Sequence, residues 1–257
     1  MKITLLGTGT SQGVPVLGCA CEVCKSNDNH DKRLRTSALV ETESTRVLID
    51  CGPDFREQML KQPFRKIDGV LITHIHYDHV AGLDDLRPYC QFGDIEIYSE
   101  EDVAKGLQNN MPYCFPDDNE NKLYPGVPKL NLNTIHVHNT FRIGDLDIMP
   151  IRIKHDTMSI LGFRIGKLVY ITDMKSIDDD ELEYLKGIEI LVVNALRWDK
   201  PHHSHQLVDD AIAFSKKIGA KKTYLTHLTH SIGLDKVANR RLPEGVKFGF
   251  DGEIIII

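Results

Sequence analysis

Three histidines and one aspartate fall within six residues of this chain, in the segment His74-Ile75-His76-Tyr77-Asp78-His79. The segment follows Gly69-Val70-Leu71-Ile72, an apolar run typical of a short buried strand. A strand end gives rigid support to side chains that face a cleft built from loops. The alternative is a solvated histidine-rich surface loop. Imidazole and carboxylate ligands together suit zinc, manganese or iron, so the segment predicts a metal site.

Composition and charge exclude several classes of protein. The chain has 257 residues, 41% of them hydrophobic, which is enough for a sizeable core. Its net charge of −6, without a long basic run, argues against extended contact with a nucleic-acid backbone. The apolar part of the N-terminus is too short for a signal peptide, and no stretch has the length of a membrane span. We therefore expect a cytoplasmic protein with no membrane contact.

Short apolar runs alternate with helical patterns along the whole chain. This alternation predicts a single α/β domain over residues 1–257, in which two packed sheets are flanked by helices. A segment rich in Pro, Asn and Asp, residues 111–128, is expected to be a loop. The expected strands are 2–6, 37–40, 46–49, 70–73, 95–98, 130–138, 146–153, 162–165, 168–172, 188–193, 223–226 and 253–257, and the expected helices are 55–62, 100–109 and 206–218, with another opening at 176–178.

Three more residues of ligand type stand just past predicted strands. They are His155, Asp173 and His227. Each alone is ordinary, because a lone polar residue after a strand usually lies on the surface or forms a satisfied contact in the core. Together with the histidine-rich segment they complete a site of the kind that two-metal hydrolases need.

In spacing and order these motifs resemble the metallo-β-lactamase superfamily of hydrolases, and the resemblance covers nearly the whole chain. It implies an αββα sandwich with the site at one edge. It also implies two divalent ions that share a carboxylate: His74, His76 and His155 would bind one ion, Asp78, His79 and His227 the other, and Asp173 would bridge them. Such a bridge offers one oxygen to each ion and offsets their mutual repulsion.

Asp50, which stands at a strand end before Gly52, matches the first motif of the same superfamily. The resemblance implies that Asp50 orients the histidine loop through hydrogen bonds. An aspartate before glycine also commonly forms a turn, and both roles can hold together.

Within the superfamily, two regions are similar to the phosphoribosyl cyclic phosphodiesterases of the carbon–phosphorus lyase pathway. They are Gly7 to Pro15 with the cysteines that follow, and Leu225 to His230 with Gly249-Phe250-Asp251-Gly252. The resemblance implies a structural zinc on Cys19, Cys21, Cys24 and His230. Three thiolates and one imidazole suit a closed tetrahedral zinc site, and the alternative is three free thiols in a loop. Gln12 replaces the third glycine of a dinucleotide-binding fingerprint, which excludes that motif.

His205 lies at the position of the family's general acid, so the resemblance assigns it the protonation of a leaving oxygen. Its alternative is to cap the helix expected to begin at Gln206. His202 and His203 stand close by, and their roles stay open.

We therefore expect a hydrolase with two zinc or manganese ions that cleaves a small phosphodiester, such as a cyclic phosphate of ribose. Asp78 would bind metal and orient the attacking water. The alternatives are a hydrolase of carboxylic esters, thioesters or lactones, a tRNA 3′-processing endonuclease, and a non-enzymatic metal-binding scaffold. The sequence leaves a homodimer open.

Overall fold

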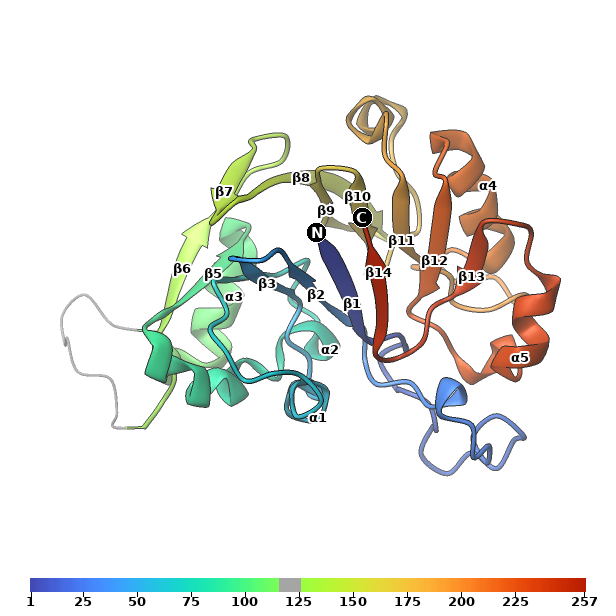
Figure 1. The fold of residues 1–257 in the computed structure, drawn as a ribbon, viewed down its shortest axis with the longest axis horizontal. Helices are drawn as coiled ribbons and strands as arrows, with labels where there is room; N and C mark the ends of the chain where they lie inside the picture. The colour runs from blue at the N-terminus through green and yellow to red at the C-terminus, as the bar shows by residue number, and fades with distance from the viewer. Residues whose placement is uncertain (116–125) are drawn as a thin grey trace.

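Two seven-stranded sheets pack face to face in the computed structural model, which describes residues 1–115 and 126–257 (Figure 1). The first sheet has the strand order β14-β1-β2-β3-β4-β5-β6, and the second β13-β12-β11-β10-β9-β8-β7. The first comprises β1 Lys2–Gly7, β2 Ser37–Glu41, β3 Arg46–Ile49, β4 Gly69–Leu71, β5 Ile95–Ser99, β6 Leu130–Thr134 and β14 Glu253–Ile256. The second comprises β7 Phe141–Ile143, β8 Leu146–His155, β9 Met158–Ile165, β10 Leu168–Ile171, β11 Ile190–Asn194, β12 Lys222–Thr226 and β13 Val246–Phe248.

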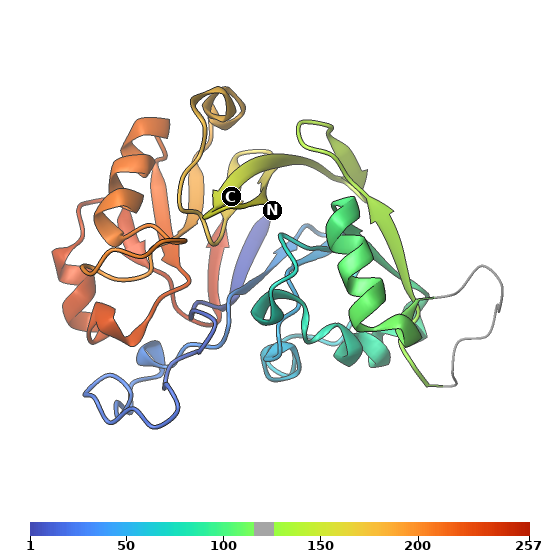
Figure 2. The same cartoon turned by 180° about the vertical axis from the view of Figure 1, so that it is seen from behind.

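Helices cover the outer face of each sheet. Figure 2 shows α3 over the first sheet and α4 over the second. The α-helices are α1 Phe55–Met59, α2 Tyr77–Val80, α3 Glu101–Asn110, α4 Val208–Ile218 and α5 Asp235–Ala238. The 3-10 helices are Asn29–Asp31, Leu83–Phe92, Pro112–Cys114, Asp179–Leu185, His230–Ile232 and Asn239–Arg241. This arrangement is the predicted αββα sandwich.

The strands read as continuous apolar runs because both of their faces are buried. In β2, Ala38 and Val40 pack between the sheets, whereas Leu39 packs under the outer helices. In β11, Val192 faces the inner core and Leu191 the outer one. Side chains alternate across a strand, so a strand buried on both faces needs apolar residues at every position.

Parallel pairing brings the ends of distant segments to one edge of the sandwich. Strands β3, β4, β5 and β6 run parallel in the first sheet, and β10, β11, β12 and β13 in the second. Carboxyl ends of parallel strands lie on the same edge, which is where ligands bind in open α/β sheets. The long antiparallel hairpin β8–β9 ends beside them, with His155 opposite Met158.

The structure differs from the sequence predictions in short elements. The helix expected to open at 176–178 is only the 3-10 helix Asp179–Leu185. The strand expected over 130–138 ends at Thr134, and His138 further on has a left-handed φ of 63°. β9 begins at Met158, four residues before the expected start, because it pairs with β8 from Ile148 to the end of that strand at His155. Of the loop expected over 111–128, residues 116–125 lie outside the described residues, and Pro112–Cys114 is a 3-10 helix. Among the described residues, no helix is long and apolar enough to cross a membrane.

Candidate metal centre

All seven residues that were predicted to bind two metal ions lie at or just past strand ends, or in the short helix α2. His74 and His76 follow β4, and α2 contributes Asp78 and His79. His155 is the last residue of β8, Asp173 follows β10 and His227 follows β12. The structure therefore brings together residues that are spread over more than half of the chain.

Sharp backbone turns aim several of these side chains. Asp50, Asp173 and His227 have φ values of 57°, 57° and 55°. Left-handed backbone is uncommon outside glycine and persists where the surrounding structure enforces it, often at functional sites. Asp50 and His227 directly follow β3 and β12, and Asp173 lies two residues past the end of β10. The turn at each residue directs its side chain across the strand ends.

The first ligand group consists of His74, His76, His155 and Asp173. Their ligand atoms all lie within 4.8 Å of one another. Nε2 of His74 is 3.0 Å from Nδ1 of His76. Nε2 of His74 and Nε2 of His155 lie 3.9 and 3.8 Å from Oδ2 of Asp173.

The second group consists of Asp78, His79, His227 and, again, Asp173, with the same 4.8 Å limit between ligand atoms. Nε2 of His79 and Nε2 of His227 lie 3.2 and 3.5 Å from Oδ2 of Asp78. The same nitrogens lie 3.4 and 3.3 Å from Oδ1 of Asp173. Asp173 therefore turns one carboxylate oxygen to each group, which is the geometry of a bridging ligand.

Hydrogen bonds orient three of the imidazoles. Nδ1 of His79 donates to Oδ2 of Asp50 at 2.7 Å, and Nδ1 of His155 donates to the Ser204 carbonyl at 2.9 Å. The Thr73 hydroxyl donates its one proton to Asp50, so it accepts from Nδ1 of His74 at 2.9 Å. Each ring is thereby held with Nε2 facing its ligand group. The sequence predictions omitted Thr73 and Ser204, although Thr73 directly precedes the motif.

Asp50 is fully buried and touches both the histidine loop and α2. Besides His79, its carboxylate accepts from the Thr73 amide at 2.9 Å. The neighbouring Gly52 allows the backbone to pack against Asp78 of α2, because a Cβ at position 52 would lie 2.1 Å from the Asp78 carbonyl oxygen. Asp50 thus contacts the histidine loop and α2, as the orienting role implied by the resemblance requires.

Charge and burial in the site favour a neutral His74 and an ionised Asp173, the states that metal binding requires, whereas they favour a protonated His79. Burial and the neighbouring His79 hold the pKa of His74 well below its ordinary value. Burial raises the pKa of Asp173, but the flanking His227 and His79 outweigh it and hold the value well below the usual range. Burial lowers the pKa of His79, yet Asp173 and Asp50 raise it well above normal. The raised pKa of His79 shows that Asp173 and Asp50 produce a strong negative field, which attracts divalent cations.

Several buried nitrogens lack hydrogen-bond partners among the described residues. They include Nε2 of His79, Nε2 of His227 and Nδ1 of His205. Buried polar atoms in native structures nearly always have a partner, and an ion is one way to supply it. Nitrogen and carboxylate oxygen donors at these separations fit two divalent ions.

His205 lies over the centre without belonging to either group. Its ring centroid is 4.8 Å from those of His155 and His227, and its Nδ1 is 3.9 Å from Oδ2 of Asp173. Burial and the nearby His227 lower the pKa of His205 to about 3. It does not cap α4, which begins at Val208. His202 stacks on it at 5.0 Å, and His203 stacks on His202 at 4.4 Å.

The three clustered cysteines converge on one histidine. Sγ atoms of Cys19, Cys21 and Cys24 each lie 3.3 Å from Nδ1 of His230. Tetrahedral zinc with ordinary bond lengths separates sulfur from nitrogen by about 3.5 Å. The Cys24 amide donates to the Cys21 sulfur and lowers the pKa of that thiol to about 6. These four residues fit a closed zinc site that ties the N-terminal loop to the chain just after His227.

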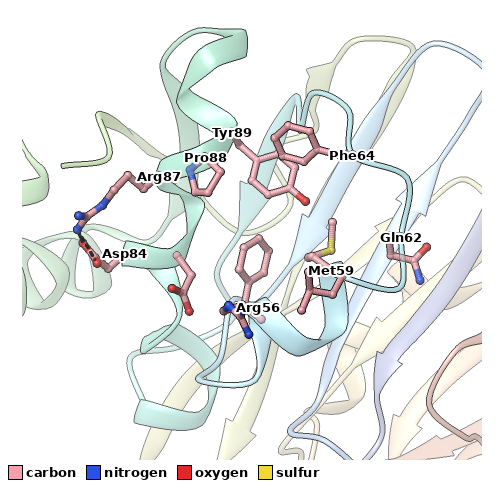
Figure 3. A pocket seen from close by; sticks show the side chains of 11 residues that line it. Arg56, Met59, Gln62, Phe64, Asp84, Arg87, Pro88 and Tyr89 are labelled. Carbon is pink, nitrogen blue, oxygen red and sulfur yellow. Dashed lines mark hydrogen bonds and ion pairs between the residues drawn. The ribbon is translucent and has the colours of Figure 1, made fainter. Parts of the chain in front are cut away.

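A mainly apolar pocket of about 550 Å³ lies away from both ligand groups, between α1 and the 3-10 helix Leu83–Phe92 (Figure 3). Phe64 and Tyr89 lie side by side in it, and Arg87 pairs with Asp84 at its wall. No candidate ligand lines this pocket, so it is not part of the metal centre.

Comparison with known proteins places these features in a family. The model of the beta-lactamase superfamily domain matches residues 45–228. A crystal structure described as a new diphosphatase from the PhnP family superposes with a TM-score of 0.90 and 36% identity, covering 100% of this chain and 97% of that one.

Two curated relatives carry different names. An octanoyltransferase from Porphyromonas gingivalis is 43% identical over 258 residues; the match covers 100% of this chain and 52% of the relative, so the chain spans about half of that protein's length. The anti-Pycsar protein Apyc1 of Bacillus phage 010DV004 is 34% identical, with 88% of each chain covered.

Proposed function

We propose that this chain, which belongs to the metallo-β-lactamase superfamily of hydrolases, is a dinuclear phosphodiesterase that acts on small phosphodiesters as one domain over residues 1–257. The observation that carries the proposal is Asp173, whose two oxygens face two separate groups of histidines at 3.3 to 3.9 Å. A carboxylate so placed suits a pair of ions, and pairs of ions are typical of enzymes that cleave phosphate esters.

His74, His76 and His155 would bind one ion, and Asp78, His79 and His227 the other, with Asp173 shared. Zinc and manganese both suit these donors, whereas the three cysteines and His230 select zinc. When bound, two divalent ions supply Lewis acidity: they lower the pKa of water and neutralise charge on the phosphoryl oxygens.

The remaining steps fall to side chains of the chain itself. The Asp78 carboxylate, beside His79 and His227 in the second group, would accept a hydrogen bond from the attacking water and so direct it at phosphorus. His205, whose ring lies 4.8 Å from the rings of His155 and His227, would donate a proton to the departing oxygen. An anionic phosphoryl group beside His205 favours its charged form, because opposite charge raises the pKa of an imidazole.

The similarity to the PhnP-family diphosphatase supports phosphorus as the centre attacked. The octanoyltransferase relative favours a second candidate, hydrolysis of an acyl ester or thioester. The same ligand groups suit attack on a carbonyl carbon, and the fold alone does not decide between the two. The octanoyltransferase is about twice as long as the part that matches this chain, so its name gives weaker support for an activity of this chain.

A substrate panel tests the proposal. Protein loaded with zinc or with manganese is assayed on bis-p-nitrophenyl phosphate, cyclic ribose phosphates, p-nitrophenyl octanoate, acyl thioesters and lactones. We expect turnover of phosphodiesters that Asp173→Ala abolishes. Turnover of the acyl substrates by fully metallated protein that leaves every phosphodiester intact rejects the proposal in favour of the second candidate.

A further inference from the structure

The ring of His205 lacks the kind of hydrogen bond that orients the imidazoles of the ligand groups. Nδ1 of His79 and Nδ1 of His155 donate to fixed acceptors, whereas Nδ1 of His205 has no partner among the described residues. The position of His205 therefore depends on the rings around it and on its own backbone. The segment that carries it, residues 195–207, joins β11 to α4. The contacts that fix this segment to the sheet thus decide where His205 lies.

Two buried amide side chains, Asn194 and Gln206, fix the base of this segment, and we call them the amide pair. Nε2 of Gln206 donates to the Asn194 carbonyl at 2.8 Å. The main-chain amide of Gln206 donates to the Met174 carbonyl at 3.0 Å. Asn194, the last residue of β11, binds the same Met174 backbone. Its Oδ1 accepts from the Met174 amide at 2.8 Å, and its Nδ2 donates to the Met174 carbonyl at 3.0 Å.

The amide pair connects the bridging carboxylate to His205. Met174 directly follows Asp173, and Gln206 directly follows His205. A short chain of hydrogen bonds therefore joins the neighbours of both residues. Nδ1 of His205 lies 3.9 Å from Oδ2 of Asp173. Through these neighbours, the amide pair sets the separation between the two side chains.

Burial makes the amide pair suitable for holding a fixed geometry. Asn194 and Gln206 are 0% and 3% exposed. The Met174 carbonyl accepts two hydrogen bonds, one from each residue, and the Gln206 carbonyl accepts from the Leu196 amide at 3.1 Å. Buried polar groups whose partners are all present rigidify a structure and specify one arrangement. The pair is thus a rigid support for the residue that follows it in space, His205.

We propose that Asn194 and Gln206 are positioning residues that hold His205 at the metal centre in reach of the departing oxygen. The inference rests on the proposed function and deepens it, because it names the residues that support the proton donor. A displacement of about 1 Å in an active site can cost about 100-fold in rate. Loss of one hydrogen bond of the pair should therefore slow the step that His205 serves, while the two ions, which depend on other side chains, still bind.

Removing one hydrogen bond of the pair tests this. Gln206→Met keeps the approximate size of the side chain but cannot donate to the Asn194 carbonyl. Gln58→Met is the matched control, because Gln58 is also buried and its Nε2 donates to the Arg35 carbonyl at the same distance of 2.8 Å. Two substrates are compared: adenosine 2′,3′-cyclic phosphate, whose leaving group is an alkoxide, and bis-p-nitrophenyl phosphate, whose leaving group departs without a proton.

We expect Gln206→Met to lower kcat on the cyclic phosphate by about tenfold or more. Its KM, its metal content and its rate on bis-p-nitrophenyl phosphate should stay within about twofold of wild type. Gln58→Met should keep both rates within about twofold, although it loses a comparable buried hydrogen bond. An equal loss on both substrates, no loss on either, or the same selective loss in Gln58→Met overturns the proposal.

Crystal structures of wild type and both variants give a readout that needs no catalysis. In Gln206→Met, the separation between Nδ1 of His205 and Oδ2 of Asp173 should grow by about 1 Å or more, whereas Gln58→Met should leave it unchanged. An unmoved His205 in Gln206→Met contradicts the assignment.

A second variant covers the case in which Gln206→Met does not fold. Asn194→Asp keeps the acceptor for the Met174 amide and loses only the donor to the Met174 carbonyl, so the same selective loss and the same displacement of His205 are expected. Normal kcat on the cyclic phosphate with His205 in place in this variant also overturns the proposal. Absence of all phosphodiester turnover in wild-type protein would instead refute the proposed function, while the crystal structures still test the amide pair.

Discussion

Replacing Asp50 by Asn should disable the second ligand group while the fold survives. Oδ1 of Asp50 accepts from the Thr73 amide at 2.9 Å, and Oδ2 accepts from Nδ1 of His79 at 2.7 Å. An asparagine that keeps its oxygen toward Thr73 turns an NH₂ group toward His79. Nδ1 of His79 must then become the acceptor, so the ring proton moves to Nε2, the atom that faces Asp78 and Asp173.

The expected size of the effect follows from that change of tautomer. A protonated Nε2 cannot bind a metal, and loss of a partner that orients a ligand typically costs about 10- to 100-fold in metal affinity. Because Asn keeps the hydrogen bond from the Thr73 amide, the substitution should lower the free energy of unfolding by only about 1–3 kcal/mol, the penalty for one disturbed buried contact. Asp50→Ala removes every acceptor from the Thr73 amide and His79, so it should be less stable than Asp50→Asn.

Metal titration against a chromophoric chelator measures the metal affinity, and thermal unfolding measures the stability. Asp54→Asn is the control, because Asp54 is a partly buried carboxylate that pairs with Arg35 and does not belong to either ligand group. The control should bind both catalytic ions with wild-type affinity. If Asp50→Asn binds both ions as tightly as wild-type protein does, the tautomer argument is wrong.

Three further outcomes are expected. Cys21→Ser should lose one zinc per chain and lower the melting temperature while the two catalytic ions still bind, which elemental analysis and calorimetry check; unchanged zinc and melting would count against the thiolate site. Asp173→Ala should weaken both catalytic ions and abolish turnover, and a variant with two tightly bound ions and near-normal rate would exclude the bridge. Burial raises the pKa of Asp251 to about 6, so the folded state binds its proton more tightly than the unfolded state does. Its contribution to the free energy of unfolding should therefore be full below about pH 4 and be lost as pH rises through about 6; Asp251→Asn should lack that dependence in urea titrations, and identical profiles would contradict the assignment.

Most of the ligand candidates could be recognised in the sequence because they stand at or just past strand ends, whereas their division into two groups came from the family resemblance. Strand ends are readable as the boundary between an apolar run and a polar residue, as at Ile171-Thr172-Asp173. The two packed sheets flanked by helices followed from the apolar runs, which are apolar at successive positions because both faces of strands such as β2 and β11 are buried, and the family resemblance specified the αββα sandwich.

Other features depend on contacts that leave no local pattern. The Ser204 carbonyl orients His155 through a backbone atom, for which the side chain of residue 204 carries no signal. A cavity beside His74 joins Glu100, which precedes α3, His136, which follows β6, and Ser159 of β9, residues that are far apart in the sequence. Short elements such as β7 and β13 have three residues each, too few for a hydrophobic period to show.

Anomalous diffraction from crystals grown with zinc tests the central claim most directly, because it locates the ions without any assumption about substrate. Two peaks about 3.5–4 Å apart should lie on either side of the Asp173 carboxylate. A third should lie among Cys19, Cys21, Cys24 and His230. A single peak beside Asp173 in fully loaded protein, or two peaks that do not share its carboxylate, would contradict the account of a dinuclear hydrolase.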